Sequence, residues 1–339
     1  MTRQSFQFPG GSTDLYFAGG FSHLKDITDR RNTVLITDEQ VFALHQKRFR
    51  NWKVIVLKAG EEYKVQATAD SIIEQLIDME ADRKTTLVGV GGGVVTDITG
   101  YVASVYMRGI RFGFVPTTLL ALVDASIGGK NGIDLGVYKN IVGTIRQPAF
   151  ILHDLVFLNT LPVAEWQNGF AEIIKHACIK DPAMFRELQE HSVEYYRKKK
   201  IPLCKLIQKN ARIKIRIVQA DEREQGDRKL LNFGHTLGHA LENQYELSHG
   251  QAIAVGMTYA CRFSEELLGF RRSEDVIGLL DQYGLPAYLS FDHKKVMKVL
   301  KMDKKREQNL ISYILLERIG KGVIRQIPVD QVSAMLSLI

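Results

Sequence analysis

Short apolar runs alternate with longer amphipathic stretches through the first half of this 339-residue chain. The runs end at polar or glycine turns, as buried strands do, and the stretches between them have the apolar spacing of helices. Because strands that alternate with helices form parallel sheets covered on both faces, this order predicts an α/β fold with a mostly parallel sheet. The predicted strands are residues 32–38, 52–60, 85–93 and 112–121, and the predicted helices are residues 66–83 and 94–109. The residues expected near one face of the first helix are Ile72, Ile73, Leu76, Ile77 and Met79.

The pattern changes near Leu161, beyond which helical periodicity dominates. Helices are expected over residues 165–181 and 203–222 and around the histidines that follow, and residues 310–320 form a strand-like run. We therefore expect an α/β domain in residues 1–161 and a mainly α-helical domain in residues 162–339.

The composition is that of an ordinary intracellular protein. The three cysteines are widely spaced and form no CxxC pair, which favours a reducing compartment, and the first residues lack the apolar segment of a signal peptide. No window approaches 18 uninterrupted apolar residues. The formal net charge of +7 favours an anionic partner, but no nucleic-acid-binding motif accompanies it. These features predict a cytoplasmic protein that acts on a small anion and binds neither nucleic acid nor membrane.

The stretch "GVGGGVVTD" (89–97) follows a predicted strand and opens a predicted helix. Glycines at such a turn let the backbone approach a pyrophosphate, and the helix offers its first N–H groups. The strict G-x-G-x-x-G spacing fails, because Val94 or Thr96 occupies the third glycine position. The position of the glycines between a strand and a helix nevertheless favours a nucleotide site over a plain tight turn. Asp38, at the end of another predicted strand, could bind the ribose hydroxyls of that nucleotide.

Three of the nine histidines lie in "LLNFGHTLGHALENQYELSHGQ" (230–251). His235 and His239 share a helix face, as do Glu172 and His176 earlier in the chain. Zinc in catalytic sites takes three nitrogen or oxygen ligands, so several triplets are possible, and the spacing does not choose among them.

Cationic residues lie beside glycine turns or strand edges rather than on plain helix faces. As a set they indicate an anionic substrate, since Lys and Arg bind phosphate and carboxylate through charge-assisted hydrogen bonds. The set comprises Lys130, Lys139 with Asn140, Arg228, and Lys304 with Lys305.

Several segments together resemble the 3-dehydroquinate synthase family of sugar phosphate cyclases. The resemblance extends from residues 37–38 to residues 303–305 and is strongest in "GGGVVTDITGYVASVYMRG", "VPTTLLALVDASIGGKNGID", "KNIVGTIRQP", "GFAEIIKHACIKD", "LLNFGHTLGHALE" and "SHGQAIAVGM". It implies an N-terminal NAD-binding domain, a C-terminal helical domain that binds a divalent metal, zinc or cobalt, and a homodimer.

The implied activity is that of a carbon–oxygen lyase of the shikimate pathway, which supplies chorismate and the aromatic amino acids. NAD+ transiently oxidises C5 of 3-deoxy-D-arabino-heptulosonate 7-phosphate, phosphate is eliminated, and the hydride returns. Ring opening and an intramolecular aldol closure then give 3-dehydroquinate.

The resemblance also assigns residues. The implied metal ligands are Glu172, His235 and His249. The implied catalytic residues are His239, which would move protons, Glu224, Lys175 and Lys130. The implied NAD contacts are Asp38, Glu61, Lys64, Gly92, Gly93, Val94, Asp97, Thr117, Thr118, Lys139, Phe157, Leu158, Asn159 and Thr160. The implied substrate contacts are Arg108 (from the neighbouring subunit), Asp124, Lys130, Asn140, Lys175, Lys214, Arg228, Asn232 and one of Lys304 and Lys305.

Three positions depart from the family pattern: Gln251, Thr96 and Arg146. The alternatives are another sugar phosphate cyclase, acting on sedoheptulose 7-phosphate or glucose 6-phosphate, and an NAD- and metal-dependent polyol dehydrogenase. Lys214 and Arg228 match the family's carboxylate contacts, which favours the heptulosonate.

Overall fold

The structure, a computed structural model, describes residues 1–136, 138–242, 244–302 and 309–338. It divides into two compact units. Unit 1 comprises Met1–Glu165 and Cys204–Arg223, and unit 2 comprises Trp166–Leu203 and Glu224–Ile339. This division differs from the two continuous domains expected from the sequence, because residues 204–223 pack with the first unit.

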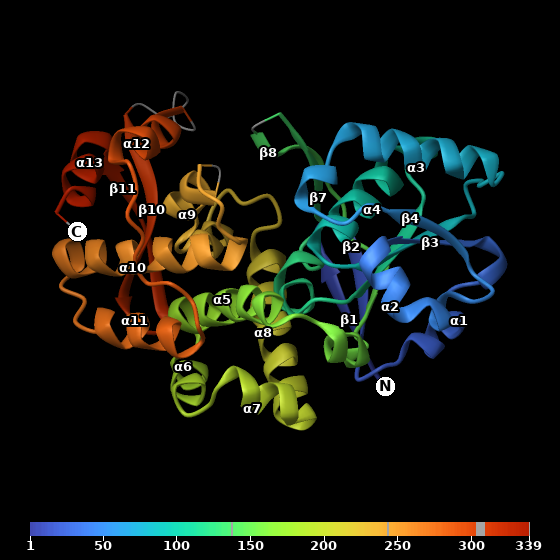
Figure 1. The fold of residues 1–339 in the computed structure, drawn as a ribbon, viewed down its shortest axis with the longest axis horizontal. Helices are drawn as coiled ribbons and strands as arrows, with labels where there is room; N and C mark the ends of the chain where they lie inside the picture. The colour runs from blue at the N-terminus through green and yellow to red at the C-terminus, as the bar shows by residue number, and fades with distance from the viewer. Residues whose placement is uncertain (137, 243, 303–308, 339) are drawn as a thin grey trace. The chain divides into compact units, whose positions relative to one another are not determined.

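Unit 1 is built on a seven-stranded sheet in the order β1-β2-β9-β6-β5-β3-β4. Figure 1 shows β3 and β4, the last two strands of this order, side by side. Only the β1–β2 pairing in this sheet is antiparallel, so the prediction of an α/β fold with a mostly parallel sheet is confirmed. The strands are β1 (Thr2–Phe8), β2 (Gly11–Phe17), β3 (Thr33–Asp38), β4 (Lys53–Leu57), β5 (Thr86–Gly91), β6 (Arg111–Pro116) and β9 (Phe150–Leu152). A separate antiparallel hairpin is formed by β7 (Lys130–Leu135) and β8 (Tyr138–Ile145).

Helices cover both faces of this sheet, as alternation along the strands requires. Val34 and Ile36 of β3 face one side, and Leu35 between them faces the other. The first side is covered by α3 (Gln66–Asp78), α4 (Gly93–Val105) and the second half of α8 (Lys200–Ala220), and the other by α1 (Leu24–Ile27) and α2 (Glu39–Phe49).

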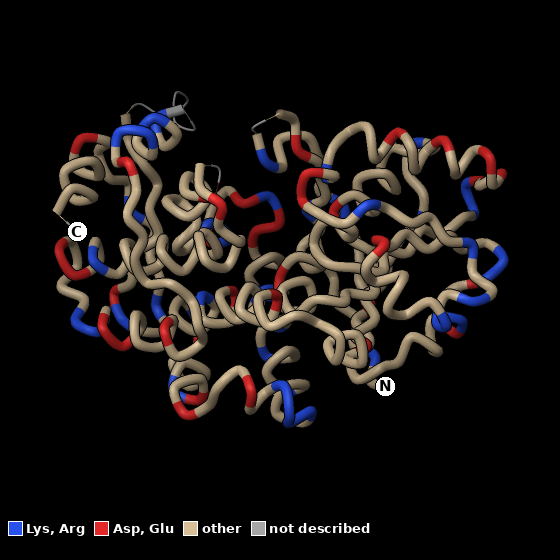
Figure 2. The backbone as a smooth tube through the Cα atoms, viewed as in Figure 1, with Lys and Arg blue, Asp and Glu red and all other residues tan. Residues whose placement is uncertain are grey.

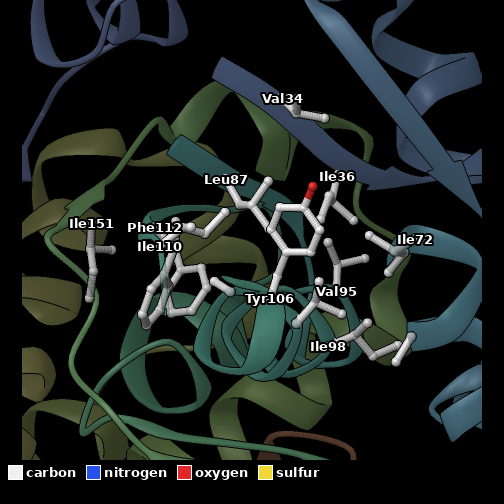
Figure 3. Packing of buried hydrophobic residues seen from close by; sticks show 14 of the residues in the cluster. Val34, Ile36, Ile72, Leu87, Val95, Ile98, Tyr106, Ile110, Phe112 and Ile151 are labelled. Atoms are coloured by element: carbon white, nitrogen blue, oxygen red, sulfur yellow. The ribbon is translucent and has the colours of Figure 1, made fainter. Parts of the chain in front are cut away.

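The core beneath α3 and α4 is closely packed. Figure 3 shows Val95 and Ile98 of α4 beside Ile72 of α3, with Leu87 of β5 nearby. Ile77 of α3, expected on the same face, is instead 61% exposed, because it lies one residue past the buried Leu76. The expectation for Ile77 is therefore wrong.

Unit 2 is mainly helical and contains one two-stranded sheet, β10 (Leu310–Arg318) with β11 (Lys321–Pro328). The expected helices over residues 165–181 and around the histidines are present, as is the strand near 310–320. The unit's helices are α5 (Val163–Lys180), which begins in unit 1, α6 (Pro182–Gln189), α7 (Val193–Lys198), α9 (His235–Glu242), α10 (His249–Leu268), α11 (Ser273–Gln282), α12 (His293–Met302) and α13 (Val329–Leu336).

The distribution of charged and apolar residues along the described chain shows no single charged segment and no membrane-spanning helix. Figure 2 shows acidic residues interspersed with basic ones in both units, so the formal net charge of +7 is not concentrated in a single segment. Among the described helices, none combines the length and apolar character needed to cross a bilayer.

Candidate active site

Four of the predicted nucleotide residues of unit 1 lie at the carboxyl ends of three neighbouring strands. Asp38 ends β3, Gly92 and Gly93 follow β5, and Thr117 follows β6. This edge of a parallel sheet is where such folds bind nucleotides. A Cβ on Gly92 would lie 3.0 Å from the Thr118 side chain, so the turn has little room for any residue but glycine.

The polar groups at this edge fit a nucleotide. Gly92 is the N-cap of the 13-residue helix α4, whose first N–H groups can bind a phosphate. The Thr117 hydroxyl is buried and has no hydrogen-bond partner among the described residues, so it is available to form a hydrogen bond with a ligand. Asp38 already accepts the Val41 N–H at 2.8 Å as the N-cap of α2, and burial raises the pKa of its carboxyl.

Lys64 lies at the centre of a second group of predicted residues. Its Nζ lies 2.7 Å from Asp97 Oδ2 and 3.7 Å from Glu61 Oε1, and it donates to Asn140 Oδ1 at 2.6 Å. Burial alone would lower the pKa of Lys64, but the charges of Asp97 and Glu61 outweigh burial and raise it. Lys64 is therefore a buried ammonium group that links Glu61 and Asp97, two predicted NAD contacts, to Asn140, a predicted substrate contact.

Other substrate candidates of unit 1 form a second ion pair. Lys214 of α8 lies 2.9 Å from Asp124 Oδ1 and donates to the Asp124 carbonyl at 2.7 Å. Lys130 begins β7 and is exposed. Arg108 is exposed at the end of the turn after α4, with a left-handed φ of 65°.

In unit 2, three of the predicted residues form a candidate metal centre. One ligand atom from each of Glu172, His235 and His249 lies within 4.8 Å of the others. Glu172 Oε1 lies 3.4 Å from His235 Nε2 and 3.2 Å from His249 Nε2. Two imidazoles and a carboxylate are the ligands of catalytic zinc sites that keep one position open, so these residues fit a divalent metal.

The second nitrogen of each ring is turned toward a protein acceptor. His235 Nδ1 lies 3.1 Å from the Phe233 carbonyl, and His249 Nδ1 lies 3.5 Å from Glu242 Oε2. Such partners hold the Nδ1–H tautomer and leave Nε2 to bind the metal. Glu242 has no role in the sequence prediction, although it lies two helical turns after His235, on the same face of α9.

The Lys175 ammonium is paired with the Glu172 carboxylate on α5. Burial opposes ionisation of Glu172, but Lys175 and the His235 ring outweigh it and hold the pKa of its carboxyl well below its ordinary value. Glu172 is therefore an anion, ready to bind a cation.

Close contact between α9 and α10 brings the two histidine ligands together. A Cβ on Gly256 of α10 would collide with the carbonyl oxygen of Gly234, which has a left-handed φ of 80°. A Cβ on Gly238 would lie 3.0 Å from the Ala252 carbonyl oxygen. These glycines let the helices approach closely, with His235 and His249 each at the first turn of its helix.

Of the remaining predicted residues of unit 2, His239 lies beside the candidate metal centre. His239 is exposed, and its ring centroid lies 5.1 Å from that of His235. Asn232 donates to Glu224 Oε1 at 2.6 Å, and Arg228 is buried in the same segment. The predictions for Lys304 and Lys305 lie outside the described residues.

The three departures from the family pattern have local structural partners. Gln251 completes a capping box with Ser248 at the start of α10. The Thr96 hydroxyl donates to the Gly93 carbonyl at 2.9 Å. The Arg146 guanidinium donates to the Ala103 carbonyl and lies over the Phe112 ring. None of these contacts involves a predicted metal ligand.

Comparison with solved structures defines the class. The fold matches 2-deoxy-scyllo-inosose synthase complexed with carbaglucose-6-phosphate, NAD+ and Co2+, with a TM-score of 0.86 and 25% identity over 99% of both chains. It also matches a 2-epi-5-epi-valiolone synthase from Streptomyces hygroscopicus subsp. jinggangensis 5008 with NAD+ and Zn2+ bound, with a TM-score of 0.85 and 24% identity, covering 100% of this chain and 97% of that one. The fold is that of the sugar phosphate cyclases.

Sequence comparison narrows the class to one family. Residues 54–168 match the N-terminal and residues 169–306 the C-terminal model of 3-dehydroquinate synthase. The chain is 41% identical to 3-dehydroquinate synthase of Pyrococcus abyssi, covering 83% of this chain and 84% of that one. It is 38% identical to the enzyme of Saccharolobus solfataricus, covering 93% and 92%. The chain belongs to the 3-dehydroquinate synthase family, which confirms the resemblance seen in the sequence.

Proposed function

We propose that the protein converts 3-deoxy-D-arabino-heptulosonate 7-phosphate to 3-dehydroquinate and phosphate. The observation that carries the proposal is the group of Glu172, His235 and His249, in a chain whose two halves match the two models of this family. When bound, NAD+ would accept the hydride from the C5 carbon, and the divalent metal would act as a Lewis acid toward the oxygen of the C5 hydroxyl, which loses a proton.

The residues of the chain prepare both groups for this chemistry. The turn after β5 and the Thr117 hydroxyl would hold the nucleotide. Lys175 keeps Glu172 ionised, and the acceptors at each Nδ1 aim the two imidazoles. His239, exposed beside His235, would carry protons to and from the substrate, and Glu224 would act with it.

Cationic residues would bind the charged ends of the substrate. To its phosphate and carboxylate we assign Lys130, Lys175, Lys214 and Arg228, together with Arg108 from the neighbouring subunit. Asp124, Asn140 and Asn232 would bind its hydroxyl groups.

Identity favours the heptulosonate over other sugar phosphates. The chain is 36–42% identical to relatives named 3-dehydroquinate synthase but 25% identical to 2-deoxy-scyllo-inosose synthase. Phosphate release should therefore be compared for heptulosonate 7-phosphate, sedoheptulose 7-phosphate and glucose 6-phosphate. We expect kcat/KM to favour the first by about 100-fold or more, because the others leave the carboxylate-binding cations unpaired. A higher kcat/KM for sedoheptulose 7-phosphate or glucose 6-phosphate, which lack the carboxylate, would show that the proposed substrate is wrong.

We also propose a homodimer. The Arg146 guanidinium donates to the Ala103 carbonyl and the Thr144 hydroxyl donates to the Ser104 hydroxyl, so the ends of β8 and α4 lie side by side. Apolar side chains are exposed along β8 and around the end of α4, and we call four of them the β8–α4 patch: Val105, Met107, Ile141 and Ile145. A second copy of the chain would cover this patch, next to Arg108.

We place the protein in the cytoplasm. Cys178, Cys204 and Cys261 are all free thiols, and two of them are buried. Free thiols without a disulfide framework suit a reducing compartment.

A further inference from the structure

The β7–β8 hairpin is irregular at one position. Ile133 pairs with Val142, and Leu135 pairs with Tyr138. Asp134 of β7 therefore lies opposite residues 139–141 of β8, one residue against three. Asn140, within this bulge, has a left-handed φ of 53°. Bulges of this kind change the direction of a side chain and often lie beside active sites.

Asp134 holds the bulge in place. Its Oδ1 accepts the Asn140 N–H at 2.6 Å, and its own N–H donates to the Lys64 carbonyl at 2.7 Å. The neighbouring Val65 forms a parallel bridge with Asp134, so the hairpin is tied to the segment before α3. Asp134 is buried, which makes its carboxylate a shielded acceptor for this one backbone group.

Lys64 fixes the other end of Asn140. An ammonium group only donates, so the Asn140 amide must turn its oxygen toward Lys64. The NH2 group of the exposed Asn140 is then the end presented to a ligand. The same ammonium lies 2.7 Å from Asp97, a predicted NAD contact.

We propose that Asp134 is a positioning residue, which holds Asn140 so that its NH2 group can donate to an oxygen of the sugar phosphate. Lys64 joins this substrate contact to the nucleotide residues Glu61 and Asp97, so that the two binding sites share one network around a buried ammonium group. The inference rests on the proposed function, in which Asn140 contacts the substrate.

Two substitutions at Asp134 test the role of the acceptor. Asp134→Ala removes the acceptor and should raise KM for the heptulosonate phosphate about tenfold, with kcat within about twofold of the wild type. Asp134→Asn keeps an oxygen acceptor and should leave KM within about threefold of the wild type. An unchanged KM in Asp134→Ala, or equal losses in both variants, would overturn the proposal.

A second background shows whether Asp134 acts through Asn140. Asn140→Gly removes the amide while tolerating a positive φ. In that background Asp134→Ala should raise KM no further, whereas additive effects would show that Asp134 acts elsewhere.

Hydrogen exchange at the Asn140 N–H separates this inference from the proposed function. The N–H should exchange slowly in the wild type and in Asp134→Asn, and at least about tenfold faster in Asp134→Ala. Unchanged exchange in Asp134→Ala would refute the positioning role. A wild-type protein that releases no phosphate from the heptulosonate would refute the proposed function instead.

Discussion

The three histidines of residues 235–249 differ in what their ring nitrogens contact. His235 and His249 each direct Nε2 toward Glu172 and Nδ1 toward a protein acceptor. His239 is exposed and lies beside His235, on the same helix. Two rings therefore have the surroundings expected of metal ligands, and the third is exposed beside them, as the proposed proton transfer by His239 requires.

Alanine substitutions separate these roles. His235→Ala removes one of three ligands, so bound zinc and activity should be lost together. His239→Ala should retain the metal and lose activity by about 10²–10⁴-fold, the usual contribution of a general acid or base. Metal content per chain and kcat are the two measurements. Full metal retention by His235→Ala would refute the ligand assignment.

Glu242 lies 3.5 Å from His249 Nδ1, and we expect it to orient this ring without binding the metal itself. Glu242→Gln weakens the acceptor at Nδ1 and should lower zinc affinity about 10–100-fold, measured by competition with a chelator. Glu266→Gln, on an exposed position of α10, is the matched control and should bind zinc like the wild type. Equal affinities for the two variants would show that Glu242 does not support the site.

At the residue scale, the sequence points to the candidate ligands but not to the groups around them. The resemblance to the family implies Glu172, His235 and His249, and the structure brings these three side chains together. Glu242 and Asp134 act through a contact with one particular atom, and that contact depends on how α9 meets α10 or on a bulge in β8. The pattern of apolar residues in the sequence predicts neither the contact between α9 and α10 nor the bulge in β8.

At the scale of elements, we expect the close contact between α9 and α10 to set the geometry of the candidate metal site. Gly256→Ala would force a methyl group against the Gly234 carbonyl, which is backbone and cannot move aside as a flexible side chain would. We expect the free energy of unfolding to fall by about 1–3 kcal/mol, the usual cost of overpacking, and zinc affinity to fall with it. Urea denaturation and zinc titration measure the two effects.

Gly278→Ala is the control for this substitution. Gly278 is exposed within α11, and a Cβ there meets nothing within 4 Å. It should raise the free energy of unfolding by roughly 0.5–1 kcal/mol, the helix-propensity gain of Ala over Gly. If Gly256→Ala were as stable as Gly278→Ala, the close approach of the two helices would not constrain the site.

Strands with a clear pattern of buried apolar residues could be predicted from the sequence, and strands without one could not. Strands β3, β5 and β6 are buried apolar runs, and the segments between them are long enough to contain a helix. Because a connecting helix returns the chain to the same end of the sheet, parallel pairing of these strands could be expected. By contrast, β1 and β8 are mostly exposed or half-buried, and β9 has only three residues. Their pairing depends on neighbours far along the chain, which a local pattern does not reveal.

At the scale of the whole molecule, the β8–α4 patch is the proposed dimer contact. Ile145→Glu places a charge in it and should convert the dimer to a monomer, measured by light scattering during gel filtration. Ile77→Glu, at an exposed apolar position on α3, should leave the dimer intact. A dimer that survives Ile145→Glu would place the subunit contact elsewhere.

The central claim concerns the reaction that the whole chain catalyses, in which NAD+ is oxidant and then reductant within one turnover. The most direct test supplies heptulosonate 7-phosphate with zinc or cobalt and NAD+ at one tenth of the substrate concentration, and follows phosphate and NADH together. We predict that phosphate release reaches the full amount of substrate without accumulation of NADH, and that a chelator abolishes it. NADH formed from a simple polyol, with no phosphate released from the heptulosonate, would contradict the claim and indicate a dehydrogenase.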